Sequence, residues 1–446
     1  MYASDAKHSN QSLGQKLLSI YGLRASTLSS IDLGIRKPYR LLLERLGNPH
    51  QKLPPVIHVA GTNGKGSTIA FVQSILNGAG YSTHIYTSPH LISFNERIRL
   101  QGQSISDEKL EAYLDEALEM AQDLDITFFE LTTAMAFKVF ADHPADFILL
   151  ETGLGGRLDC TNVIQKPVAT VITRIGYDHI EFLGNQIDDI AFEKAGIMKK
   201  DVTCIIAKQE FDNLYAQFKQ RAQEYGATLC CCGSEWDIKD GSFHSGNTQF
   251  SLNDLGLSGL YQRENAANAI ACILSLKQSG IIDIDDTSIQ SGLKKAHWSA
   301  RLEKLDHGHL AGLLPQGWEL WLDGGHNEMA GQALAAQINH WQSTDHKKLH
   351  VICAMMNHKD AKSFFKPVIQ DASSVQIIPI NQEDAAYKPE QLADILKPLY
   401  DDVKTAQSLE SAIEIAVHDH NDQAGGRILI CGSLYLAGQV LKNDQA

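Results

Sequence analysis

The chain has 446 residues, of which 43% are hydrophobic and 21% charged, and its formal net charge at pH 7 is -14. This length suits two or three globular domains, and the negative charge argues against a nucleic acid or an anionic membrane as partner, although it still allows a local basic pocket for an anionic substrate. We find neither a signal peptide nor a membrane-spanning apolar run, and none of the eight cysteines forms C-x-x-C, which together favour a reducing, cytoplasmic location.

The first part of the chain alternates between apolar strands and helices, which predicts a mostly parallel sheet with helices on both faces. Strands are expected at 54–61, 82–89, 145–153, 167–176 and 201–209. Helices are expected at 65–80, 106–124, 129–143, 187–198 and 263–281. Three consecutive cysteines, Cys230 to Cys232, are interpreted as part of a buried strand rather than as a metal site. The polar, turn-rich segment 234–259 predicts an antiparallel patch.

A boundary is expected near residues 297–305, because strand and helix alternation restarts beyond it. The predicted domains are therefore 1–298 and 299–446, the second being a smaller α/β domain. Its expected strands are 318–325, 348–356, 374–380 and 427–435, and its expected helices are 328–341, 389–400 and 409–420.

The segment 56–72, VIHVAGTNGKGSTIAFV, looks like a phosphate-binding loop but does not match G-x-x-x-x-G-K-[ST]. Val59 stands where the pattern has its first glycine, and Gly66 stands where it has Ser or Thr. A strand nevertheless leads into a glycine-rich turn and a helix, so that backbone N–H groups, the positive helix end and Lys65 could converge on an anion. We favour a nucleotide site over a plain strand-to-helix turn. The residues concerned are Gly61, Gly64, Lys65 and Gly66, with hydroxyls from Ser67 and Thr68.

Two polar side chains follow consecutive strands at the sheet edge expected to carry this loop. Glu151 ends the apolar run DFILLE, and His179 follows the next strand in VITRIGYDHIEFLG. Ligands of open α/β sheets gather at the carboxyl ends of the strands, where a carboxylate can hold the Mg²⁺ that accompanies nucleotide phosphates. Either residue alone is typical of an ordinary strand end, whereas both beside a phosphate loop favour a metal site.

Lys194 interrupts an apolar helix face. Ile187 and Ile190 mark this face at positions i and i+3, and Lys194 occupies position i+7. Such a lysine usually extends its amine to the surface, where Asp189 or Glu193 could pair with it. A buried lysine would instead need a partner or a changed charge. The pattern alone leaves both alternatives open.

Seven motifs in order resemble the folylpolyglutamate synthase / dihydrofolate synthase family of Mur-ligase-like, ATP-dependent amide ligases. They are HVAGTNGKGS, TSPHLISFNERI, FFELTTAMAF, ETGLGGRLDCTN, DHIEFLG, EKAGI and LDGGHN, and the resemblance covers nearly the whole chain. It explains the unusual loop, because G-T-N-G-K-[GST]-[ST] is the usual phosphate loop of this superfamily. The resemblance implies a P-loop domain with a mostly parallel sheet and helices on both faces, followed by a smaller Rossmann-like α/β domain.

The resemblance also implies roles for individual residues. The expected catalytic residues are Lys65, His179 and Lys194, and Lys194 matches a family lysine that is carbamylated by CO₂. The expected ATP-binding residues are Gly61, Thr62, Asn63, Gly64, Lys65, Gly66, Ser67, Asn265, Arg301, Asp323 and His326. The expected Mg²⁺ ligands are Ser88, Glu151, His179 and Lys194. The residues expected to face the pterin substrate are Leu33, Gly34, Ile35, Arg36, Thr127, Phe128, Phe129, Glu130, Leu158, Asp159 and Cys160.

The sequence departs from the family pattern at four places. Thr152 stands in ETG where E-V-G is usual, and Cys160 stands where alanine is usual. WSARLE replaces W-P-G-R-x-E but keeps Arg301, and DGGHNEMA replaces D-G-A-H-N-P. Because no charged group is lost, the expected activity is retained.

The implied reaction joins L-glutamate to dihydropteroate, to the glutamate tail of a reduced folate, or to both, and we expect both. ATP would phosphorylate the acid to an acyl phosphate, and the amine of glutamate would then displace phosphate. The expected cofactors are ATP and Mg²⁺, and the expected partners are these small molecules, with no nucleic acid or membrane. The resemblance favours a monomer.

Two alternatives of different kinds are weighed against this function. Another amino-acid ligase of the Mur superfamily, such as a peptidoglycan ligase, would carry a further small domain before its phosphate loop, and Lys65 lies too near the N-terminus for that. A non-catalytic ATP- or folate-binding protein would not need the full set of Lys65, Glu151, His179 and Lys194. Both alternatives are therefore less favoured.

Overall fold

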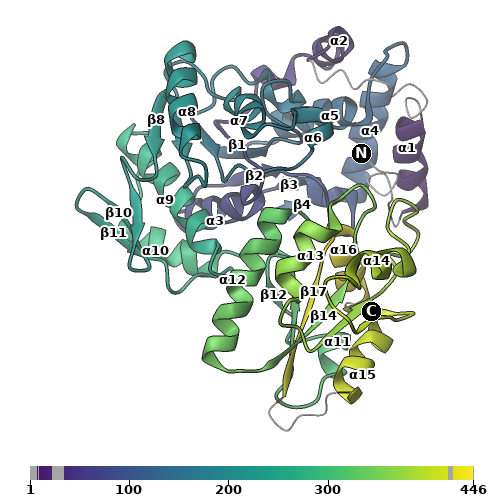
Figure 1. Ribbon diagram of the computed structural model, residues 1–446. Helices are drawn as coiled ribbons and strands as arrows, with labels where there is room; N and C mark the ends of the chain where they lie inside the picture. Colours follow the sequence, from purple (N-terminus) through teal and green to yellow (C-terminus); the bar gives the residue numbers. More distant parts are fainter. Residues whose placement is uncertain (1–7, 9, 23–34, 420–424, 445–446) are drawn as a thin grey trace. The chain divides into compact units, whose positions relative to one another are not determined.

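The computed structural model of the protein describes residues 8, 10–22, 35–419 and 425–444 (Figure 1). The chain divides into two compact units. The first comprises the described residues up to Gly256 together with Gln262–His297, and the second comprises Leu257–Tyr261 and the residues from Trp298 onward. Among the helices that the structure describes, none is both long and apolar enough to cross a membrane.

An eight-stranded sheet forms the centre of the first unit, with the strand order β4-β3-β2-β5-β1-β6-β7-β8. All neighbours from β2 to β8 pair in parallel, and β3 and β4 add an antiparallel edge. The predicted mostly parallel sheet is thus confirmed. The strands are β1 (Val56–Ala60), β2 (Thr83–Tyr86), β3 (Ile98–Leu100), β4 (Gln103–Ser104), β5 (Phe147–Glu151), β6 (Ala169–Ile172), β7 (Thr203–Ile206) and β8 (Thr228–Cys231).

Helices cover both faces of this sheet, as predicted. On one face α3 contacts β1 and β5, α9 contacts β6 and β7, and α10 packs on α3. On the other face α5, α7 and α8 contribute to the two apolar clusters that include Val56 and Ala60 of β1. The helices are α1 (Gln11–Gly22), α2 (Lys37–Arg45), α3 (Lys65–Gly78), α4 (Asp107–Ala121), α5 (Phe128–Asp142), α6 (Ile180–Leu183), α7 (Ile187–Ala195), α8 (Asn213–Tyr225), α9 (Gln262–Gln278) and α10 (Asp286–Lys295), with short 3₁₀ turns η2 (Pro49–Gln51), η3 (Phe94–Arg97) and η4 (Cys160–Val163).

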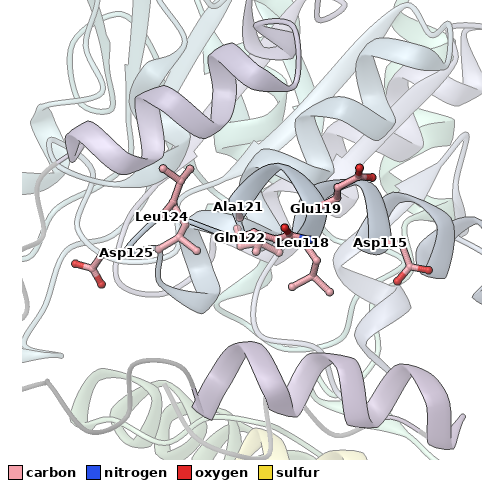
Figure 2. Close-up of a pocket in the computed structure, with 9 residues that line it drawn as sticks. Asp115, Leu118, Glu119, Ala121, Gln122, Leu124 and Asp125 are labelled. Atoms are coloured by element: carbon pink, nitrogen blue, oxygen red, sulfur yellow. The ribbon is translucent and has the colours of Figure 1, made fainter.

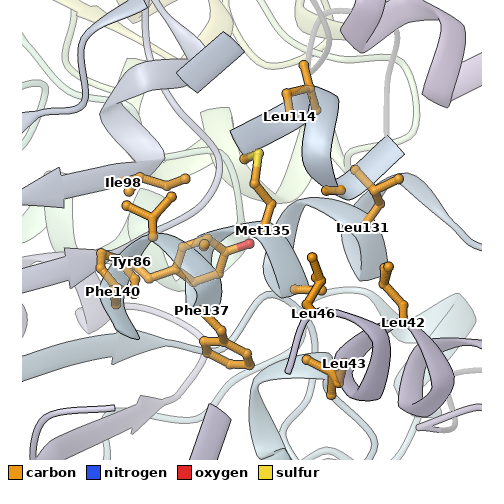
Figure 3. Close-up of a cluster of buried hydrophobic side chains, with 14 of the residues drawn as sticks. Leu42, Leu43, Leu46, Tyr86, Ile98, Leu114, Leu131, Met135, Phe137 and Phe140 are labelled. Carbon is orange, nitrogen blue, oxygen red and sulfur yellow. The ribbon is translucent and has the colours of Figure 1, made fainter. Parts of the chain in front are cut away.

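A large apolar cluster of this unit joins α2, α4 and α5 to the sheet (Figure 3). Tyr86 of β2, Leu114 of α4, and Met135 and Phe137 of α5 are all buried within it. Because α5 is buried over most of its surface, its N-terminal residues are held rigidly beside the sheet. Several predicted substrate-binding residues lie at that N-terminus.

The prediction of a buried strand at the three cysteines is wrong in part. β8 is the last strand of the sheet, so it has a strand neighbour on one side only. Cys230 and Cys231 are therefore half-buried, and only Cys232 is buried. The predicted antiparallel patch is confirmed and consists of β9 (Asp237–Lys239), β10 (Ser242–Ser245) and β11 (Thr248–Ser251).

The second unit is a smaller α/β unit built on a six-stranded sheet with the order β12-β13-β17-β14-β15-β16. All its strand pairs are parallel except that of β12 with β13. The strands are β12 (Glu303–Lys304), β13 (Glu319–Leu322), β14 (Lys348–Cys353), β15 (Ser374–Ile377), β16 (Val403–Thr405) and β17 (Gly426–Cys431). The helices are α11 (His309–Gly312), α12 (Glu328–Thr344), α13 (Ala361–Ile369), α14 (Pro389–Leu396), α15 (Leu409–Asp419) and α16 (Leu434–Asp444).

The turn between α12 and β14 contains a strained residue whose replacement should stabilise the protein. His346 is exposed and has a left-handed φ of 55°, a conformation that costs a residue with a Cβ about 1–2 kcal/mol and glycine almost nothing. After allowing for the greater freedom of glycine in the unfolded chain, His346→Gly should raise the free energy of unfolding by about 0.5–1 kcal/mol. The same change at His340, an exposed residue inside α12, should lower it by roughly 0.5 kcal/mol. Urea unfolding of both variants checks the opposite signs.

Candidate active site

Hydrogen bonds with the segment that follows β6 fix the loop between β1 and α3. The amides of Thr62 and Asn63 donate to the carbonyl of Arg174, at 3.0 and 3.4 Å. The Thr62 hydroxyl donates to the carbonyl of Gly176 at 3.0 Å, and the Thr173 hydroxyl donates to the carbonyl of Asn63 at 2.7 Å. The segment after β6 therefore sets the shape of the predicted phosphate loop.

Two glycines in this loop lie so close to neighbouring side chains that any larger residue would force those side chains to move. A Cβ at Gly61 would lie 1.8 Å from the Thr173 hydroxyl oxygen, and a Cβ at Gly64 would lie 2.3 Å from Asn265 Oδ1. Gly64 also precedes α3 with φ 88°, in the left-handed region. Asn265, a predicted ATP-binding residue of α9, thus packs directly against the loop.

Two lysine side chains converge on a single carbonyl of the loop. Lys65 Nζ donates to Gly61 O at 3.1 Å and lies 3.7 Å from Glu151 Oε1. Lys194 Nζ donates to the same Gly61 O at 2.9 Å. The Lys194 side chain does not pair with Glu193, whose carboxylate accepts from Arg157 at 2.7 Å instead. The structure therefore brings together Lys65, Lys194 and Glu151 from three separate elements.

Lys194 is the buried member of this cluster, with only 5% of its surface exposed. Burial lowers the pKa of its amine to about 7, and the positive charge of Lys65 contributes to this shift. A large fraction of the amine is therefore neutral near neutral pH. This is the form of lysine that reacts with electrophiles.

Three of the four predicted metal ligands lie at the carboxyl ends of strands or in the loops that follow them, and the fourth, Lys194, lies in α7. Glu151 ends β5 opposite Val59 of β1, and one of its oxygens lies 3.4 Å from the amide of Ser88. His179 immediately precedes α6, and 42% of its side chain is exposed. Within the described part of the chain, no group of three or more His, Cys, Asp or Glu side chains is placed to hold a metal. The carboxylate, hydroxyl and imidazole suit a cation that takes its other oxygens from a bound phosphate.

Two of the predicted substrate-binding residues form a buried ion pair. The Glu130 carboxylate, 3% exposed, accepts from the Arg36 guanidinium through two bonds and from the amide and hydroxyl of Thr127, at 2.8 and 2.7 Å. The guanidinium also donates to the carbonyl of Asp125 at 3.0 Å. Leu33 and Gly34 lie outside the described residues, and Ile35 is partly buried against the core. Arg36 and Glu130 thus engage each other at the start of α5.

Glu130→Gln should destabilise the protein by about 3 kcal/mol, because the buried Arg36 cation then keeps only the exposed Asp125 carboxylate, 3.4 Å away, as its counter-charge. Urea unfolding measures this loss. Asp123→Asn is the matched control, since Asp123 also accepts two bonds from one arginine, Arg45, but its side chain is 68% exposed. Surface pairs are screened by water, so the control should unfold like the wild type. An equally small change in Glu130→Gln would contradict the importance of the buried pair.

The other predicted substrate-binding residues meet beside the turn that follows β5. The Phe129 ring lies against Gly153, where a Cβ would come within 2.2 Å of the ring. The Asp159 carboxylate is buried and accepts from the Gly153 amide at 3.0 Å. The Tyr39 hydroxyl donates to the carbonyl of Cys160 at 2.9 Å. Phe128 is buried and Leu158 is half-buried. The FFE and LDC segments, distant in sequence, are therefore neighbours.

A separate pocket of about 550 Å³ lies at the end of α4 and in the segment that joins it to α5 (Figure 2). Its lining combines apolar side chains with three carboxylates. None of the predicted site residues lines it, although Asp125 in its wall also contacts Arg36. The lining residues are Asp115, Leu118, Glu119, Ala121, Gln122, Leu124, Asp125, Ile126 and Leu131.

The second unit places three predicted ATP-binding residues around the carboxyl end of β13. Asp323 is buried and accepts from the Tyr261 hydroxyl at 2.8 Å and from the Leu302 amide at 2.8 Å. Burial raises the pKa of Asp323, and the nearby Arg301 cation opposes this shift. His326 Nδ1 lies 3.0 Å from the carbonyl oxygen of residue 324. Tyr261 is not predicted from the sequence, because nothing local to it signals a partner 62 residues away.

Comparison with known proteins identifies the class. Residues 59–276 match the model for the Mur ligase middle domain, and residues 309–443 match that for the dihydrofolate synthetase C-terminal domain. The dihydrofolate synthase/folylpolyglutamate synthase of Bacillus subtilis is 34% identical over 420 residues, covering 90% of this chain and 93% of that one. Its Escherichia coli counterpart is 31% identical over 418 residues, and the match covers 93% of this chain and 92% of that one.

Solved structures give the same result. Escherichia coli FolC in complex with DHPP and ADP has a TM-score of 0.82 at 28% identity. The match covers 96% of this chain and 97% of the FolC chain. A bifunctional folylpolyglutamate synthase/dihydrofolate synthase with Mn, AMPPNP and L-glutamate bound has a TM-score of 0.78 at 26% identity. The match covers 94% of this chain and 95% of that one. The fold is that of a Mur-type, ATP-dependent ligase. The chain belongs to the dihydrofolate synthase/folylpolyglutamate synthase family, which confirms the resemblance read from its motifs.

Proposed function

We propose that this protein joins L-glutamate to dihydropteroate and to the glutamate tail of reduced folates, with ATP and Mg²⁺. The observation that carries the proposal is the convergence of Lys65, Lys194 and Glu151 on the phosphate loop. Relatives of the same fold, which match nearly the whole chain, bind DHPP with ADP, or AMPPNP with Mn and L-glutamate. We further propose that the enzyme acts as a monomer, which the family resemblance favours, and in the cytoplasm, which its cysteine pattern favours.

The reaction proceeds in two transfers. A carboxylate oxygen of the acid attacks the γ-phosphorus of ATP, the bond to the β-phosphate oxygen breaks, and ADP leaves. The amine of glutamate then attacks the acyl carbon. The bond between that carbon and the phosphate oxygen breaks, so that phosphate leaves, and the amine loses a proton. The loop amides and the N-terminus of α3 orient the phosphates. Lys65 neutralises charge on the phosphoryl group during the first transfer.

The other predicted site residues are proposed to bind the metal, ATP and the pterin. The donor set of Ser88, Glu151 and His179 would hold Mg²⁺, which when bound neutralises phosphate charge as a Lewis acid. The buried amine of Lys194 would become a carbamate, which adds two oxygens to this set. The residues proposed to bind ATP are Gly61 to Ser67, Asn265, Arg301, Asp323 and His326, and those proposed to face the pterin are Leu33 to Arg36, Thr127 to Glu130 and Leu158 to Cys160.

ADP release measured with four substrate mixtures tests the proposal. Dihydropteroate and tetrahydrofolate are each supplied as the acid, with and without L-glutamate, at saturating ATP and Mg²⁺. We expect sustained ADP release only when an acid and glutamate are both present, and with either acid. Release with one acid only would assign a single activity, and release with neither would contradict the proposed function.

A further inference from the structure

A line of hydrogen bonds runs from the middle of β1 to the turn that follows β5. His58 of β1 is fully buried, and its Nε2 lies 2.8 Å from the hydroxyl oxygen of Thr161. That oxygen lies 2.5 Å from Asp159 Oδ1. Asp159 Oδ2 accepts from the amides of residues 153–154, at 3.0 and 2.9 Å. The strand before the phosphate loop is thereby linked to the turn that begins after Glu151.

The chemistry of His58, Thr161 and Asp159 determines which group donates and which accepts in each hydrogen bond of this line. The Asp159 carboxylate only accepts, so the single hydroxyl proton of Thr161 is donated to it. The Thr161 oxygen can then accept from His58, which must carry its proton on Nε2. Burial lowers the pKa of His58 to about 3, so the imidazole stays neutral in this tautomer. The order is therefore imidazole N–H, hydroxyl, carboxylate.

Other contacts hold the main chain of the same segment and do not depend on His58. The Asn162 amide group donates to the carbonyls of Arg157 and Gly196, each at 3.0 Å. The Lys199 amine donates to Asn162 Oδ1 at 2.7 Å. Loss of the His58 bond should therefore leave the segment folded. The loss of this bond frees the Thr161 hydroxyl, which orients the Asp159 carboxylate.

We propose that His58 is a positioning residue for the acid substrate: through Thr161 it holds the Asp159 carboxylate and the turn 152–156 in place. The inference rests on the proposed function, in which Leu158, Asp159 and Cys160 face the pterin-bearing acid. His58 itself lies inside the sheet and touches no substrate. Its effect should therefore fall on binding of the acid and not on binding of ATP.

Three variants test this role through KM values measured separately for the two substrates. His58→Leu removes the donor, and we expect the KM for dihydropteroate to rise about tenfold, while the KM for ATP changes less than about twofold. His58→Gln places an amide N–H near the position of Nε2 and should keep the KM for the acid within about threefold of the wild type. Thr170→Val is the control, because Thr170 is the buried register partner of His58 on β6 and lies outside the line.

Hydrogen exchange gives a second readout that needs no turnover. The amides of residues 153, 154 and 161 donate to Asp159, so they should exchange faster in His58→Leu and at the wild-type rate in Thr170→Val. Unchanged exchange in His58→Leu, or an equal rise in both KM values, would overturn the inference. A wild-type enzyme without glutamate-dependent ADP release would instead contradict the proposed function, and the exchange result would still decide the role of His58.

Discussion

Lys65→Ala should lower the rate of glutamate-dependent ADP release at least about a hundredfold, since one charge-stabilising group is worth about 3 kcal/mol of barrier. The Lys65 amine lies 3.1 Å from Gly61 O and 3.7 Å from Glu151, where the transferring phosphate is proposed to bind. Its contacts are with loop carbonyls and one carboxylate, and its removal breaks no packing in the core. Rates at saturating substrates, with circular dichroism to verify folding, measure the effect.

Lys208→Ala is the control for this prediction. Lys208 is exposed and follows β7 at the same edge of the sheet, so its removal lowers the positive charge near the site without touching the loop. We expect its rate to stay within about twofold of the wild type, as is usual for a surface charge. A near-normal rate in Lys65→Ala would show that the loop does not hold the transferring phosphate.

Lys194→Ala should also lower turnover at least about a hundredfold, because it removes a proposed metal ligand. We predict that Lys194 is carbamylated: its nitrogen attacks the carbon of CO₂ and loses a proton, which leaves an anion with two oxygens. The reaction needs the neutral amine, and the pKa of about 7 makes this form abundant at neutral pH. The fraction that reacts should therefore grow as the pH rises through 7 and shrink below it. Short-chain carboxylic acids or bicarbonate should restore part of the activity of Lys194→Ala.

Carbon-13 NMR of enzyme equilibrated with ¹³C-bicarbonate detects the carbamate directly. We expect a carbamate signal in the wild type that is lost in Lys194→Ala and retained in Lys199→Ala. Lys199 is a fitting control because burial also lowers its pKa, to about 8, yet its amine donates to Asn162 and lies outside the loop. A wild-type spectrum without the signal, in enzyme that is fully active, would refute the modification.

The parts of the fold that the sequence predicted well are those with strong local signals. β1 and β5 are central strands buried on both faces, so they appear as continuous apolar runs. The strands β3 and β4 were not predicted, because they are short edge strands of three and two residues. The helix α13 was also missed, and it contains Pro367, which normally argues against a helix.

In the candidate site, too, the residues with local sequence signals could be predicted, whereas the contacts between distant segments could not. The glycines and Lys65 of the phosphate loop are contiguous, and Glu151 ends an evident strand, so local reasoning could propose them. The contact of Lys194 with Gly61 spans 133 residues, and that of His58 with Thr161 spans 103. Such pairs depend on which strands become neighbours in the sheet. Sequence periodicity could mark Lys194 as anomalous but could not name its partner.

The most direct test of the proposed ligase activity follows the glutamate itself. The enzyme is incubated with ATP, Mg²⁺, dihydropteroate and ¹⁵N-labelled L-glutamate, and the acid is then analysed by mass spectrometry. We predict that the acid gains one glutamyl residue carrying the label in an amide bond, with one ADP formed for each glutamate added. ADP formation without label in the acid, or an unchanged acid, would contradict it.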